Sequence, residues 1–111
     1  MGDRILETDW KLFRRLQPLA LDRFCQRVLA EVGQLAADSG KSHHERYLAI
    51  YRRLEDRDEQ LAAAFNDPRR STALLQLAHI RAEGLLTDEE FGQFSDGARA
   101  AVQVLLDVRR A

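Results

Sequence analysis

The spacing of apolar residues predicts a chain made of helices. Apolar side chains recur every three or four residues over most of the sequence, and no segment alternates with the two-residue period of a strand. We expect an all-α fold, a compact bundle of five or six helices around a buried central helix at about residues 68–84. The 111 residues suffice for one core. We therefore expect a single helical domain over residues 1–111, with residues 1–7 as a flexible lead-in.

The expected central helix has clear boundary signals. Asp67 followed by Pro68 is typical of a helix start, because a carboxylate accepts from free backbone N–H groups and proline suits the first helical position. Gly84 is typical of a helix end, since glycine readily takes the left-handed conformation found there. Between them the helix is apolar almost all round, which predicts burial. Its polar positions share one narrow strip, formed by Thr72, Gln76, His79 and Glu83.

Start signals divide the rest of the chain into further helices. Thr8 or Asp9 can cap the first one, and Pro18 predicts either a kink in it or a break into two helices. The sequences SHHE (42–45) and TDEE (87–90) are capping boxes, in which a hydroxyl and a glutamate satisfy each other's backbone N–H groups. Ser95 is the expected cap of the last helix.

Three charged residues fall inside otherwise apolar stripes. Asp58 lies between Leu54 and Leu61 on one helix, and Arg70 and Arg81 lie on the apolar side of the next. A charge on a buried face needs either a route to solvent or a partner of opposite sign. We hypothesise an internal Asp58–Arg81 pair, whose loss in Asp58→Ala would cost ~3–5 kcal/mol if the acid is buried.

Composition narrows the classes of protein. The chain is 45% hydrophobic and 32% charged, as folded globular proteins are, and its formal net charge is −1. That balance argues against nucleic acid as the main partner, since proteins that bind nucleic acid usually carry excess positive charge. No apolar run approaches the ~18 residues of a membrane span, so we expect no membrane and a bacterial cytoplasmic location. The single cysteine, Cys25, is expected to be a buried, inert thiol.

Candidate binding chemistry is sparse. Arg69, Arg70, Ser71 and Thr72 stand at the expected start of the central helix, where guanidinium, hydroxyl and backbone N–H groups can bind an anion. The chain's three histidines, His43, His44 and His79, lack the spacing of metal ligands. We expect no metal site, no cofactor and no catalytic residues, because no phosphate loop or nucleophile motif is present.

One local segment resembles a known family. Residues 77–91, with IRAEGLLTDEEF within them, resemble the SHOCT helical hairpin, in which a glycine turn joins two helices and acids with an aromatic residue open the second. That resemblance implies a helical hairpin and a role in oligomerisation. The chain as a whole also resembles small all-helical proteins of proteobacteria.

These patterns favour a function based on protein contacts. The apolar stripes are numerous for so short a chain, so we expect a non-enzymatic interaction or oligomerisation domain that binds a protein partner or itself, with a homodimer as one form. One alternative is the binding of a phosphorylated ligand or nucleic acid through Arg69 and Arg70. The other is an enzyme whose site has no recognisable motif, which would need a deep pocket with convergent polar groups.

Overall fold

The chain folds into five helices. A computed structural model describes residues 5–110, and this part of the chain contains no strand. The helices are α1 (Glu7–Ala36), α2 (His43–Phe65), α3 (Ala73–Ala82), α4 (Asp88–Gly92) and α5 (Asp96–Arg110). The all-α prediction is therefore confirmed. Of the flexible lead-in expected at 1–7, residues 1–4 lie outside the described part, and α1 already begins at Glu7.

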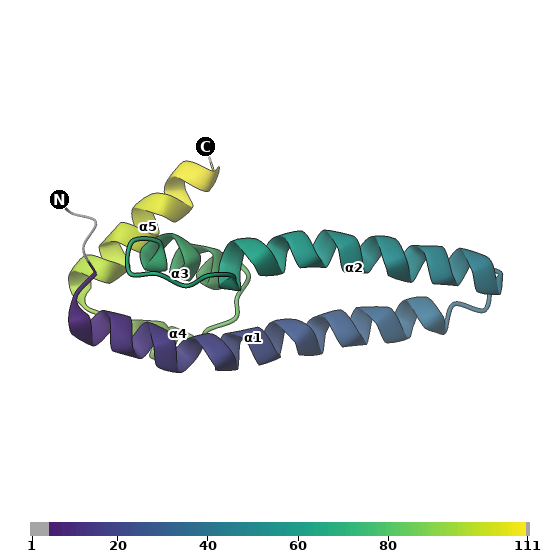
Figure 1. Ribbon diagram of the computed structural model, residues 1–111, viewed down its shortest axis with the longest axis horizontal. Helices are drawn as coiled ribbons and strands as arrows, with labels where there is room; N and C mark the ends of the chain where they lie inside the picture. The colour runs from purple at the N-terminus through teal and green to yellow at the C-terminus, as the bar shows by residue number, and fades with distance from the viewer. Residues whose placement is uncertain (1–4, 111) are drawn as a thin grey trace.

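Two long helices give the molecule its elongated shape. Helices α1 and α2 form an antiparallel hairpin whose closed end projects well beyond α3 and α5 (Figure 1), and the molecule measures 54 × 27 × 23 Å. We call residues 29–60 the arm, and residues 5–28 with 61–110 the base. No side chain of the arm is fully buried. The helices are thus compact only in the base.

Helix α1 continues through Pro18 as one helix of 30 residues. Proline removes one backbone N–H, but Pro18 lies on an exposed face, where water can hydrate the unpartnered carbonyl of Arg14. Buried Phe13 and Phe24 hold the helix against the core on either side of the proline. Of the two expectations for Pro18, the break into two helices is wrong.

The base core forms around α3, as the apolar pattern predicted. Its five largest fully buried side chains are Phe13, Leu77, Ile80, Leu85 and Val102. Two of them belong to α3, and the others come from α1, the α3–α4 turn and α5. Burial of this size stabilises the fold by roughly 1.5–3 kcal/mol per large side chain. The central position of the predicted helix is confirmed.

The start of the central helix was placed wrongly. Asp67 has φ 49°, and α3 begins only at Ala73, with Thr72 as its N-cap. A residue before proline avoids the helical conformation, so Asp67 and Pro68 reverse the chain instead of opening a helix. Residues 66–72 form the connection between α2 and α3, which includes a turn closed by the Thr72 N–H donating to the Arg69 carbonyl.

The other boundary signals agree with the structure except at the start of α1, where Leu6 is the N-cap and the expected cap at Thr8 or Asp9 is wrong. Both capping boxes are formed, Ser42 with Glu45 and Thr87 with Glu90, and Gly84 has φ 67° after the end of α3. Asp9, expected to cap α1, instead serves α5 across the molecule. Its carboxylate accepts from the backbone N–H and the hydroxyl of Ser95 at 2.9 and 2.6 Å, while the Ser95 Oγ accepts from the Ala98 N–H.

Candidate interaction surface

The three predicted buried charges do not meet. Asp58 is exposed on α2, and Arg70 is exposed and paired with Glu7 at 3.1 Å. Arg81 is partly buried, lies 4.6 Å from the centre of the Phe91 ring, and pairs with Asp88 at 2.6 Å. The expected Asp58–Arg81 pair is wrong because the turn at Gly84 brings Asp88 back to Arg81, while Asp58 lies in the arm, beyond the core.

The predicted anion site lies in the connection before α3. Arg69 forms an ion pair with Asp67, and Arg70 lies between Glu7 and the Trp10 ring. Thr72 donates its hydroxyl to the Arg69 carbonyl, and Ser71 is exposed. Both guanidinium groups therefore face carboxylates, which reduces the positive potential that would attract an anion.

The histidines lie far apart. His43 and His44 are exposed in the first turn of α2, while His79 is half-buried, with Nδ1 3.2 Å from Nη1 of Arg109. Burial and the neighbouring Arg109 lower the pKa of His79, which favours the neutral ring. Among residues 5–110, no three His, Cys, Asp or Glu side chains are grouped as metal ligands. Cys25 is only partly buried.

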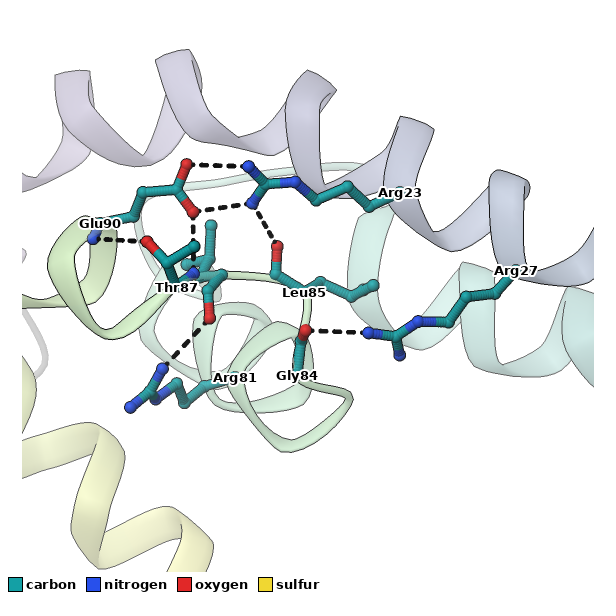
Figure 2. Close-up of polar contacts among 8 residues, drawn as sticks. Arg23, Arg27, Arg81, Gly84, Leu85, Thr87 and Glu90 are labelled. Atoms are coloured by element: carbon teal, nitrogen blue, oxygen red, sulfur yellow. Dashed lines mark hydrogen bonds and ion pairs between the residues drawn. The ribbon is translucent and has the colours of Figure 1, made fainter.

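A polar network fixes the α3–α4 turn against α1. Arg23 donates to both carboxylate oxygens of Glu90 at 2.7 and 3.0 Å and to the Leu85 carbonyl at 2.8 Å. One turn further along α1, Arg27 donates to the Gly84 carbonyl at 2.9 Å (Figure 2). The Arg23 guanidinium and the Thr87 backbone together lower the pKa of Glu90 to about 2. These groups satisfy one another, so the network is structural.

The largest grooves of the base also lack catalytic features. One groove of about 460 Å³ is lined mainly by apolar residues, which come from the segment just before α1, from α3 and from α5. Its buried acid, Asp9, has both oxygens occupied by Ser95. A second, open groove beside α5 contains Arg81, whose charge is matched by Asp88. Neither groove presents a free acid, base or nucleophile in a position to act on a substrate.

The arm is held together by a charged cluster. Glu31 of α1 faces α2, where Arg57 donates to it from Nε and Nη2 and Arg53 contacts the same carboxylate. The hydrogen bonds from Arg57 are the main reason that the pKa of Glu31 is lowered. These positions align the two helices in a place where a core would normally have apolar residues, so the arm buries little apolar surface within the chain.

Apolar residues remain uncovered along one side of the arm. We call this side the arm face; it consists of the exposed residues Leu29, Tyr47, Tyr51 and Leu54 and of Val32, which is partly buried. Leu29 is 70% exposed, and Tyr47 and Tyr51 are 66% and 55% exposed. Large apolar side chains that are exposed together on one side of a protein are typical of an interaction site.

The arm face points away from the rest of the molecule. Arg27 contacts the α3–α4 turn, and Leu29 lies two residues later, about 200° around the same helix. On α2, Gln60 lines a groove with His79 of α3, and Tyr51 lies nine residues earlier, two and a half turns away, on the opposite side. Helices α3 to α5 therefore leave the arm face open along its length.

Helical spacing alone does not distinguish the arm-face positions from core positions. Leu29, Tyr47, Tyr51 and Leu54 follow the same helical spacing as buried residues, and spacing alone does not reveal whether a partner lies within the chain. The one available signal was Glu31, Arg53 and Arg57, which interrupt both helices at core spacing. The Arg23–Glu90 pair joins residues 67 positions apart and had no local signal.

Comparison with known proteins adds no family to these observations. Within residues 5–110, no helix is both long enough and apolar enough to cross a membrane. No protein-family model, curated protein or solved structure matches the chain.

Proposed function

We propose that this protein is a non-enzymatic helical interaction domain that binds other protein surfaces through its arm face. The observation that carries the proposal is the exposure of Leu29, Tyr47 and Tyr51 on an arm with no buried core of its own. Transfer of apolar side chains of this size out of water is favourable, so a complex in which a partner covers them would be stabilised. Tyrosine suits such a contact, because its ring packs while its hydroxyl stays hydrated.

Site-specific photo-crosslinking in cells that naturally produce the protein tests the proposal. A photoreactive amino acid at Tyr51 should give a defined adduct with a protein, and Leu29→Glu should abolish that adduct. The matched control is the same amino acid at Arg52, the next residue, which is exposed about 100° around α2. If adducts at Tyr51 are no more abundant than at Arg52, the arm face is not an interaction surface.

The anion-binding alternative has weaker support. Arg69 and Arg70 already have the carboxylates of Asp67 and Glu7 as partners, and an anion would compete with both. Salt-dependent binding of nucleic acid that is lost in Arg69→Ala would favour this alternative over protein binding.

A further inference from the structure

We infer that the arm face is covered by the arm face of a second copy of this chain, so that two hairpins form a four-helix bundle. The inference rests on the proposed function and names its partner. It assigns the self-contact to one surface of the molecule, the arm face, and leaves the two bases on the outside of the assembly.

The exposed area of the chain is sufficient for such a contact. A compact monomer of 12.7 kDa exposes about 6,200 Å², whereas this chain exposes 7,523 Å². The excess is of the same order as the roughly 800 Å² that each partner contributes to a stable interface. The projecting arm contributes to this excess, because an elongated shape exposes more surface than a compact one (Figure 1).

The shape of the arm face fits a copy of itself. It is built from two antiparallel helices, with Leu29 and Val32 on α1 and Tyr47, Tyr51 and Leu54 on α2. A two-fold axis would place this two-helix surface against the same surface of the partner, and each pair of neighbouring helices would run antiparallel, as in four-helix bundles. Helices α3 to α5 lie on the side of each hairpin opposite the arm face, so they would not collide across the contact.

The distribution of charge permits two copies to approach. None of the five arm-face residues is charged, and the nearest charge along the same stripe is Asp58, one turn after Leu54. Residues 29–60 contain seven acids and five bases, mixed along the sequence. The whole chain has a formal net charge of −1, so two copies repel each other only weakly. This surface has no excess of charge of either sign that would attract a strongly acidic or strongly basic partner. An uncharged, self-complementary partner is the better match.

The first experiment measures mass in solution. Sedimentation equilibrium of the whole chain, from about 1 to 200 µM, should show a monomer–dimer equilibrium. Leu29→Glu or Tyr51→Glu should raise the dimer dissociation constant at least ~100-fold, because each places a charge in the apolar contact. The control is Leu75→Glu, at a leucine that is 50% exposed on α3, outside the arm face; it should leave the dissociation constant unchanged. Circular dichroism checks that each variant stays folded.

Mixtures of charged variants report which helices face each other. Leu29→Glu mixed with Leu29→Lys should regain association if α1 packs on α1 of the partner. Leu29→Glu mixed with Leu54→Lys should regain it if α1 packs on the partner's α2. Either rescue supports the contact. Rescue by neither mixture overturns it.

Two further results would overturn the inference. One is a wild-type chain that stays monomeric at about 200 µM. The other is a dimer whose dissociation constant is unchanged by both Leu29→Glu and Tyr51→Glu. A monomeric chain that still forms a Tyr51 adduct with a different protein in cells would overturn the second copy as partner and leave the proposed function intact. A monomer without any such adduct would remove both.

Discussion

The base and the arm are built from similar helices but are stabilised in different ways. In the base, α1, α3 and α5 bury large apolar side chains such as Phe13, Leu77 and Val102. In the arm, the same α1 continues beside α2 with a charged cluster, Glu31 with Arg53 and Arg57, at the positions between the helices. A helix can therefore be specified by local signals even where its apolar side has no partner within the chain.

The largest expected effect distinguishes the two regions directly. Leu77→Ala, at a base residue that is 1% exposed, should lower the free energy of unfolding by ~3–4 kcal/mol, because it leaves a cavity. Leu29→Ala in the arm should cost less than ~1 kcal/mol, since that side chain is already in water. Urea unfolding at about 1 µM protein, where association contributes little, measures both. Equal losses would mean that the arm has a core of its own.

A smaller effect tests the network that holds the α3–α4 turn. Glu90→Gln removes the charge that pairs with Arg23 and should cost about 1–2 kcal/mol at neutral pH, with the value reduced by partial exposure. The pKa of Glu90 is lowered from 4.5 to about 2, so its contribution is fully present above about pH 4.5 and is lost as the pH falls towards 2.

Thermal melts followed by circular dichroism between pH 7 and about 2.5 measure that contribution. The wild type should lose more stability over this range than Glu90→Gln does. Glu31→Gln makes the same comparison in the arm, because the pKa of Glu31 is also lowered by arginine partners. Parallel pH profiles for the wild type and Glu90→Gln would show that the Arg23 pair does not stabilise the base.

The smallest expected effect concerns Asp58. A buried, paired Asp58 would lose ~3–5 kcal/mol on substitution by alanine. The structure places it in solvent on the arm, so Asp58→Ala should change the free energy of unfolding by less than ~0.5 kcal/mol. Chemical denaturation at neutral pH is sufficient to separate these values. A loss above ~2 kcal/mol would indicate that a partner covers this part of α2 under the conditions of measurement.

Features governed by neighbouring residues could be predicted from the sequence. The capping boxes at Ser42 and Thr87 and the positive φ of Gly84 depend on three or four residues, so their patterns are sufficient. The predicted helix start at Asp67 was wrong because two local preferences conflict there. A carboxylate favours an N-cap, whereas the proline that follows disfavours the helical conformation of Asp67, and the second preference prevailed.

Features that depend on packing could not be predicted in the same way. Leu29 and Leu77 both occur among apolar residues at helical spacing, yet Leu29 is exposed and Leu77 is buried. The partners of Asp9 and Arg23 are Ser95 and Glu90, which only the folded chain brings near. The candidate surface was therefore present in the sequence as a stripe, and only the arrangement of α3 to α5 on one side of the hairpin identified it as uncovered.

The link between Asp9 and Ser95 bears on how the chain folds during synthesis. These residues are 86 positions apart, so a ribosome must produce most of the chain before α5 can receive its cap and the base can close. The hairpin of α1 and α2 relies on contacts between residues that are closer in sequence, and it emerges from the ribosome first. The arm is therefore complete while the base still lacks α5, so the arm face leaves the ribosome before the core that anchors it has closed.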